Sequence, residues 1–155
     1  MLLNVIKEQR NNTLLIRLIG AIDEDVQFES VVGLVPQEII VSCREIPRIN
    51  SIGVKAWMKY FQALRQKGVK FTFIECSTAI VEQFNLISNL ISGGTVESIY
   101  VPFSCTKCKS ELIGLFKCED LKKSGFTLPS LTCSKCSGPV VFDDIPEEYF
   151  RFLQR

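Results

Sequence analysis

The chain has 155 residues, of which 46% are hydrophobic and 23% are charged, and its formal net charge is +1. This is an ordinary globular composition, and a charge so close to zero argues against a general nucleic-acid or membrane-surface binder. The sequence contains no histidine. Because histidine is the usual general base at neutral pH, most hydrolase triads are excluded, and we expect a protein that is not an enzyme.

The length of the apolar runs and the number of cysteines indicate the cellular compartment in which the protein is found. No apolar run approaches the ~20 residues of a membrane span. The start, Met1–Lys7, is too short and too interrupted for a signal peptide. Seven cysteines, an odd number, argue against a disulfide framework. We therefore expect a cytoplasmic protein.

The first elements expected along the chain are strands. Residues 3–9 and 13–20 predict two strands joined by a turn at residues 10–12, with Leu14, Ile16 and Leu18 on one face. A weak helical pattern surrounds Phe28. Residues 39–41 form a continuous apolar run, which is typical of a strand covered on both faces.

The clearest expected element is a helix over about residues 52–66, ended by Gly68. Its apolar stripe is Val54, Trp57, Met58, Phe61 and Leu64. A strand over 69–73, a helix capped by Ser77 and a last strand over 96–103 follow. This alternation predicts parallel pairing through right-handed crossovers. The fold class is therefore α/β (α+β), a small mixed sheet with helices packed on it.

Three local sequences occur in a meaningful order: Gly20-Ala-Ile-Asp23, Arg48-Ile-Asn-Ser-Ile-Gly-Val54 and Phe73-Ile-Glu-Cys-Ser77. Together with the order of elements, they resemble the STAS family, the domain shared by sulfate transporters and anti-sigma factor antagonists. The resemblance covers roughly residues 3–101. It implies a bacterial signalling module that binds a protein, such as an anti-sigma factor-like kinase. A cytosolic STAS subunit of a lipid-transport complex is the alternative within the family.

The resemblance places the partner-binding surface at the start of the predicted helix, at Asn50, Ser51, Ile52, Gly53, Lys55 and Lys59. In switched members of the family, a hydroxyl immediately before the glycine is phosphorylated, but this chain has Ile52 there. Ser51 matches an earlier hydroxyl of the motif. Ser51 or Asn50 can cap the helix, and Ser51 could be only this N-cap, worth about 1 kcal/mol, or a phospho-acceptor. We favour the cap, because it requires nothing beyond the observed pattern.

Two Cys-x-x-Cys pairs predict a metal site. Cys105, Cys108, Cys133 and Cys136 could complete a tetrahedral four-thiolate shell, the geometry that structural zinc prefers. Iron is the alternative metal, since two such pairs also build rubredoxin-type sites. Four protein ligands leave no open position for catalysis. Cys43 and Cys76 are expected to serve as small buried hydrophobic residues. Cys118 could be a spare ligand, but two complete Cys-x-x-Cys pairs make it unnecessary.

The composition changes at about Pro102, and we expect three parts: a STAS-like domain over 1–103, a zinc ribbon over 104–143 and a short helical tail over 144–155. Expected ribbon strands are 111–116, 126–128 and 139–142, and chelation is expected to unfold the ribbon alone. Residues 105–136 carry six lysines and three acids. We interpret these lysines as a solvated face, against the alternative of a nucleic-acid-binding ribbon, because they are not interleaved with aromatic residues. The aromatic residues of the tail are expected to dock on one of the two domains.

Overall fold

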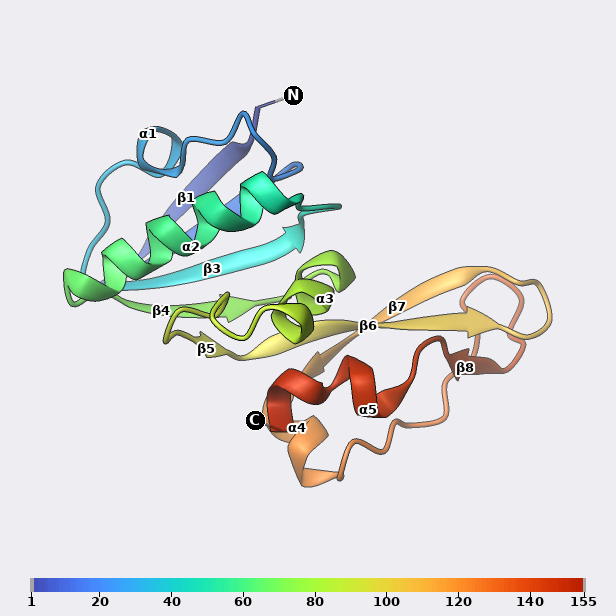
Figure 1. Ribbon diagram of the computed structural model, residues 1–155. Helices are drawn as coiled ribbons and strands as arrows, with labels where there is room; N and C mark the ends of the chain where they lie inside the picture. Colours follow the sequence, from blue (N-terminus) through green and yellow to red (C-terminus); the bar gives the residue numbers. More distant parts are fainter. Residues whose placement is uncertain (1, 155) are drawn as a thin grey trace.

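Two β-sheets and five α-helices make up the part of the chain described by the computed structural model, residues 2–154 (Figure 1). In chain order the elements are β1 (Asn4–Arg10), β2 (Thr13–Ile19), α1 (Phe28–Val32), β3 (Glu38–Glu45), α2 (Ser51–Gln66), β4 (Lys70–Ile74), α3 (Thr78–Leu86), β5 (Thr95–Val96), β6 (Ser98–Cys105), β7 (Glu111–Lys117), α4 (Cys118–Lys123), β8 (Val140–Phe142), α5 (Pro146–Tyr149) and the 3-10 helix η1 (Arg151–Gln154). None of the helices among these residues is long and apolar enough to cross a membrane.

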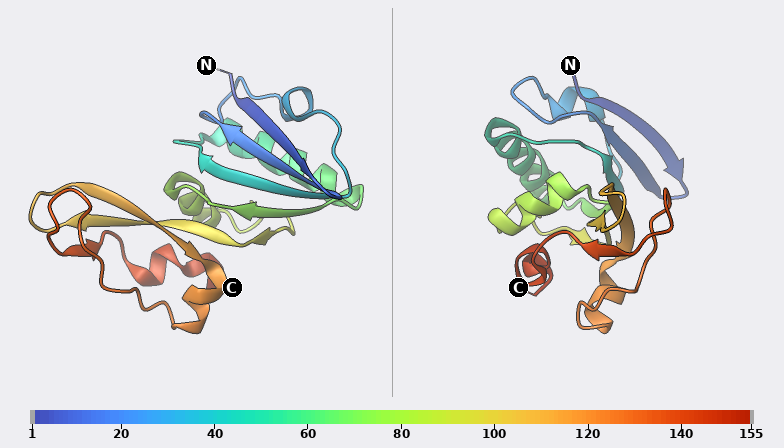
Figure 2. Two further views of the ribbon diagram at one scale, coloured as in Figure 1. Left: turned by 180° about the vertical axis from the view of Figure 1, so that it is seen from behind. Right: turned by 90° about the vertical axis from the view of Figure 1, so that its right-hand side faces the viewer.

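The first sheet has five strands in the order β1-β2-β3-β4-β5. β1 runs antiparallel to β2, and the remaining neighbours are parallel. The expected α/β class with a mixed sheet is therefore confirmed. Helices α1, α2 and α3 lie on one face of this sheet, and the opposite face carries no helix in the part of the chain described (Figure 2).

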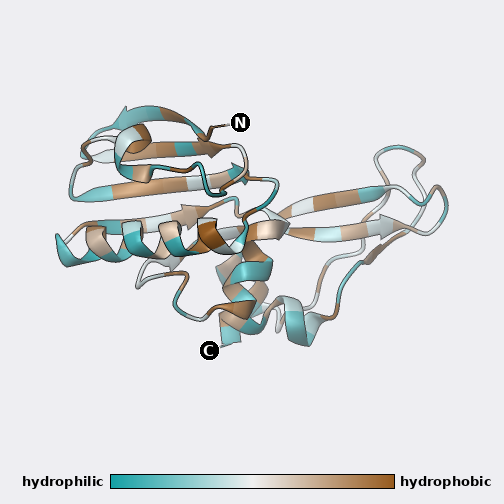
Figure 3. Cartoon of the chain, turned by 45° about the horizontal axis from the view of Figure 1, so that its top comes forward, coloured by the Kyte–Doolittle hydropathy of each residue, from teal (hydrophilic) through white to brown (hydrophobic). Residues whose placement is uncertain are grey.

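Aromatic side chains fill the space between this sheet and its helices. The Trp57 ring of α2 stacks on Phe73 of β4, with ring centroids 5.2 Å apart, and Phe28 of α1 stacks on Tyr60 at the same spacing. The expected stripe of α2 is correct except at two positions, because Tyr60 is buried and Met58 is only half-buried. Helix α1 lies over Tyr60 and covers it. Figure 3 shows the resulting mixture of hydrophobic and hydrophilic residues along α2.

The second sheet has three antiparallel strands in the order β7-β6-β8. β6 is also the continuation of the first sheet, because β5 leads directly into it and Ile99 forms a parallel bridge with Cys76. The expected strand over 96–103 is thus two strands, the second extending to Cys105. β6 therefore crosses the domain boundary that the composition predicts.

The strand expected over 126–128 is wrong. A short helix, α4, ends just before it, and the Phe126 N–H donates to the Leu121 carbonyl oxygen at 2.8 Å in a helix-terminating turn. Phe126 has a left-handed φ of 64°, which is incompatible with a strand. Its ring stacks on Phe150 of the tail, with centroids 5.4 Å apart.

The tail packs into the same core as the first sheet. Tyr149, Phe150 and Phe152 are buried together with residues of both sheets. The Tyr149 hydroxyl donates to the Tyr100 carbonyl oxygen of β6. The Asn85 side chain of α3 accepts from the Phe152 N–H and donates to the Tyr149 carbonyl oxygen, both at 2.9 Å. The expected docking of these aromatic residues is therefore confirmed, and the tail contacts both predicted domains at once.

Candidate metal centre

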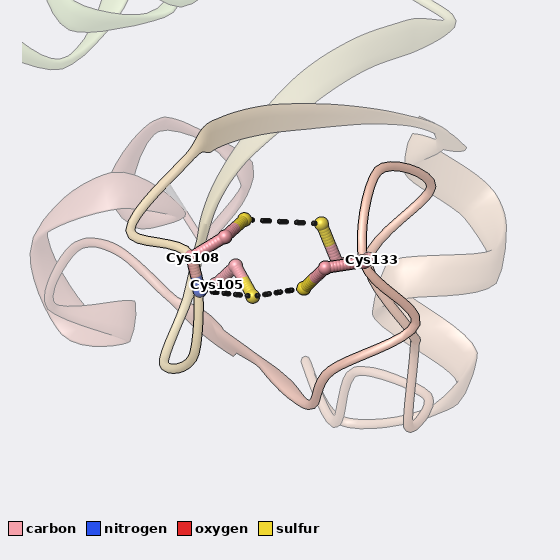
Figure 4. A group of neighbouring side chains, drawn as sticks. Cys105, Cys108 and Cys133 are labelled. Carbon is pink, nitrogen blue, oxygen red and sulfur yellow. Dashed lines mark hydrogen bonds between the residues drawn. The ribbon is translucent and has the colours of Figure 1, made fainter.

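Four cysteine side chains converge from two turns at the end of the second sheet. Cys105 is the last residue of β6, and Cys108 lies in the turn between β6 and β7. Cys133 and Cys136 belong to the segment that leads into β8. All four sulfur atoms lie within 4.8 Å of one another. The Cys105–Cys136 sulfur pair is separated by 3.4 Å and the Cys108–Cys133 pair by 3.7 Å (Figure 4).

The two turns have the same backbone hydrogen bonds. In the first, the Cys105 N–H donates to the Ser110 carbonyl oxygen, and the Lys109 N–H donates back to the Cys105 carbonyl oxygen. In the second, Cys133 is hydrogen-bonded in the same way to Gly138 and Ser137. Lys109 and Ser137 both have a left-handed φ, 64° and 63°. The equal Cys-x-x-Cys spacing thus folds twice into one turn, which presents two thiols to the same point.

Backbone N–H groups point at the sulfur atoms. Both Lys107 and Cys108 donate to the Cys105 sulfur at 3.4 Å, and Lys135 donates to the Cys133 sulfur at the same distance. The N–H groups of Cys108 and Lys107 hold the pKa of the Cys105 thiol below its ordinary value, in spite of some burial. Hydrogen bonds to a thiolate favour the deprotonated form, which is the form that binds metal.

Ser110 acts in the same way on Cys108. Its hydroxyl lies 3.1 Å from the Cys108 sulfur, and with the Ser110 backbone N–H it lowers the pKa of this thiol to about 6. The pKa of the fourth thiol shifts in the opposite direction. Although the Gly138 N–H lowers the pKa of Cys136, hydrogen bonds from its cysteine neighbours raise that pKa to about 12.

Gly138 shows that the turns are shaped around the sulfur cluster. A Cβ atom at this position would lie 2.8 Å from the Lys107 Cβ of the first turn, and 3.2 and 3.3 Å from the sulfurs of Cys136 and Cys105. Only a residue without a side chain lets the second turn approach the first this closely. The donor set, the sulfur spacing and this close approach all fit a metal ion held by four thiolates, and such a shell has no position left for a substrate.

The other cysteines are buried in the core and are not part of this centre. Cys43, Cys76 and Cys118 are free and at most 4% exposed. Burial, together with a hydrogen bond to Cys43, raises the pKa of Cys76 well above its ordinary value. Burial likewise raises the pKa of Cys118 to about 11. All three side chains contribute to the hydrophobic core, in agreement with the interpretation of Cys43 and Cys76 as small hydrophobic residues, and Cys118 joins them there.

The start of α2 is a second polar region, in a part of the molecule away from the four cysteines (Figure 1). Asn50 is the N-cap: its Oδ1 accepts from the Gly53 N–H at 2.8 Å, and its amide donates to Glu24 at 2.9 Å. The favoured interpretation of Ser51 as the cap is therefore wrong. Ser51 is the first helical residue, it is exposed, and its hydroxyl forms no hydrogen bond within residues 2–154.

Gly53 and the loop after β2 fix this helix start. The Ile22 carbonyl oxygen accepts from the Asn50 N–H at 3.1 Å, and the Ile22 N–H donates to the Arg48 carbonyl oxygen at 3.1 Å. A Cβ on Gly53 would collide with the Ile22 carbonyl group. Ile52, Lys55 and Lys59 are exposed on the same helix. The structure thus joins the 20–24 and 48–53 loops, which the sequence presents as two separate motifs.

Ser110 and Gly138 are the site residues that sequence reasoning missed. Each stands two places after the second cysteine of its pair. The sequence signal that could have identified them is a small residue at the same position of both turns, and it is recognised only when the two turns are aligned with each other. No protein-family model matches the chain, and no curated protein is significantly similar to it. Fold and site together define a mixed α/β protein with a four-cysteine cluster that could hold a metal ion.

Proposed function

We propose that this protein is a non-enzymatic protein-binding module of the STAS type, with zinc as its structural metal. The observation that carries the proposal is the exposed start of α2, where Asn50 provides the cap and leaves the Ser51 hydroxyl free. The resemblance of residues 48–54 to STAS sequences adds to it. The same resemblance suggests an anti-sigma factor-like kinase as partner.

The chemistry of this region suits a partner that combines acidic and apolar side chains. We define the α2 surface as Ser51, Ile52, Lys55 and Lys59. Ile52 is 53% exposed, an uncommon state for an isoleucine on a helix that buries most of its large apolar residues. Lys55 and Lys59 follow at intervals of four residues on one side of the helix, and the first turn of α2 carries no acid. An apolar residue with charged residues beside it suits an interface with an apolar centre and a polar rim, in which opposite charges steer the partner.

A free hydroxyl beside these cations can also act as a switch. A phosphate on Ser51 would add about −1.5 to −2 charges at pH 7, close to Lys55 and at the positive end of the α2 dipole. The phosphoprotein would retain its helix while the positive charge of the α2 surface is neutralised. Binding of an acidic partner would then be lost without unfolding.

Zinc is the metal that best suits the four thiolates. A tetrahedral ion with Zn–S bonds of about 2.3 Å places its sulfurs about 3.8 Å apart, and the two close sulfur pairs lie at 3.4 and 3.7 Å. Iron has similar geometry, and metal analysis of the purified protein distinguishes the two. Because the shell is complete, we assign the metal to holding the two turns together.

A pull-down from the native host tests the proposed function. Tagged wild-type protein is expected to retain a partner that the double variant Lys55→Glu/Lys59→Glu and the Ser51→Asp variant both lose. Lys67→Glu/Lys70→Glu is the matched control, since both lysines are exposed and follow the other end of α2. If the α2-surface variants keep every partner that the control keeps, the proposed surface is wrong.

A further inference from the structure

A small cavity lies at the carboxyl ends of three parallel strands, on the sheet face opposite α1–α3. Arg17, Ser42 and Ile74 pair in register across β2, β3 and β4. They face away from the core, because the residues that alternate with them, such as Val41 and Phe73, are buried against the helices. The cavity measures about 120 Å³ and is lined by Arg17, Leu18, Ser42, Arg44, Glu45 and Glu75.

The backbone is irregular at this cavity in two strands. Arg17 pairs with Ser42 but Ile19 pairs with Glu45, so that β3 contains an extra residue there. This bulge allows both Arg44 and Glu45 to line the cavity. At the end of β4, Glu75 has a left-handed φ of 51°. Such a conformation is strained in a residue other than glycine and concentrates at binding and active sites.

Two hydrogen bonds hold Glu75 in this conformation. Its backbone N–H donates to the Ser98 Oγ at 2.7 Å, and the buried Ser42 hydroxyl donates to its carboxylate at 3.1 Å. The carboxylate is therefore oriented by the protein before any ligand arrives. One of its oxygens is bound to Ser42, and the carboxylate retains further acceptor capacity for a ligand.

The arginines of the cavity have no carboxylate partner. Within residues 2–154 the only ion pairs are Arg10–Glu8 and Lys123–Glu119. Arg17 and Arg44 thus present unpaired guanidinium groups, and Glu45 and Glu75 present carboxylates without a cationic partner, around one small space. A simple anion would meet two glutamates there, and a simple cation would meet two arginines. A ligand with one charge of each sign complements the lining.

We propose that this cavity binds a small zwitterion, and that a free α-amino acid with a small side chain is its chemical class. The ligand carboxylate is bound by the guanidinium groups of Arg17 and Arg44, which suit planar oxygen pairs. Its ammonium group is bound by the Glu75 carboxylate. Since a water molecule occupies about 30 Å³ in the liquid, the cavity has room for roughly four waters, or for the heavy atoms of glycine or alanine. The site is independent of the α2 surface.

Titration of the full-length, metal-loaded protein with three probes tests the charge pattern. Glycine carries both charges, acetate lacks the ammonium group and methylamine lacks the carboxylate. We expect saturable NMR shifts of the residue 17, 42 and 75 amides with glycine, and affinities at least about tenfold lower for acetate and methylamine, which corresponds to about 1.4 kcal/mol. Inorganic phosphate serves as a fourth probe, and tighter binding of phosphate or equal binding of acetate overturns the zwitterion assignment.

Three variants and a control locate the site. Arg17→Gln and Arg44→Gln are expected to weaken glycine binding at least about tenfold, and because both side chains are exposed, the fold should be retained. Glu75→Gln keeps an acceptor for Ser42 but removes the charge, so it should weaken glycine while leaving acetate unchanged or tighter. Arg48→Gln, an exposed arginine outside the cavity, should have no effect. Absence of glycine binding to the wild type, or equal binding by the Arg17 and Arg48 variants, refutes the proposal.

Discussion

Replacement of Gly138 by alanine tests whether the two cysteine turns are held together by a metal. The added Cβ would lie 2.8 Å from the Lys107 Cβ, whereas carbon atoms in contact prefer about 3.5–4.0 Å. The turns must therefore separate by about 0.7 Å or more. Overpacking of this kind costs about 1–3 kcal/mol. The metal-free turns can move apart to relieve the strain, whereas the metal-bound turns cannot, so the cost falls on metal affinity.

Converted at 1.4 kcal/mol per factor of ten, this cost predicts a zinc dissociation constant about 5- to 150-fold higher in Gly138→Ala. Competition with a chromophoric zinc chelator measures it. Gly125→Ala is the control: its Cβ would meet nothing within 4 Å, but its φ of 64° makes the substitution strained. The control should lower the free energy of unfolding and leave zinc affinity unchanged. Equal zinc affinity in the wild type and Gly138→Ala would refute the idea that the turns close around a metal.

Removal of the metal with a chelator is expected to abolish hydrogen-exchange protection in residues 105–110 and 131–140. The buried middle of β6 should stay protected, because it belongs to the hydrophobic core. Loss of protection throughout β6 would contradict this prediction. Ser110→Ala removes the hydroxyl that lies 3.1 Å from the Cys108 sulfur and should raise the pKa of this thiol above about 6. Metal binding must then displace a proton from Cys108, so the variant should bind zinc more weakly than the wild type at pH 7, and an unchanged zinc dissociation constant would rule out this role of Ser110. Phe150→Ala should lower the free energy of unfolding by about 3–5 kcal/mol in urea titrations, because Phe150 is fully buried between Phe126 and Phe142; a loss below about 1 kcal/mol would mean that the tail is not part of the core.

The elements that depend on periodicity could be predicted from the sequence. The α2 stripe repeats every 3.6 residues, and Leu14, Ile16 and Leu18 of β2 follow a period of two. The continuous apolar run at residues 39–41 predicts a strand covered on both faces, and this is wrong: in the described part of the chain helices lie on one face of the sheet only, and Ile40 is half-buried.

Tyr60 was missed because α1 covers it, and α1 is too short to give a strong pattern. The turn after α4 could not be predicted, because it depends on the left-handed backbone conformation of Phe126. The apolar side chain of Phe126 favours a strand and gives no indication of that conformation.

Of the candidate metal site, only the features that depend on the spacing of the cysteines could be predicted from the sequence. Two Cys-x-x-Cys pairs are sufficient to identify the four sulfur donors. The role of Gly138 depends on how closely the second turn approaches the first, which no local pattern records. The sequence allows Asn50 or Ser51 as the N-cap of α2, because both are good caps, and only the backbone angles show that it is Asn50 and not the favoured Ser51. The change of composition near Pro102 predicts a boundary, but composition does not reveal that β6 is shared.

The insertion of the tail into the core has a consequence for protein synthesis. Tyr149 is hydrogen-bonded to Tyr100 and Asn85, and Phe152 packs on Phe84. Residues 146–154 therefore contact parts of the chain that are synthesised much earlier. Contacts of such large sequence separation form late and slow the folding reaction. During synthesis on the ribosome, the apolar surface around α3 would therefore stay exposed until residues 146–154 have emerged. The protein should depend most on chaperones during this interval.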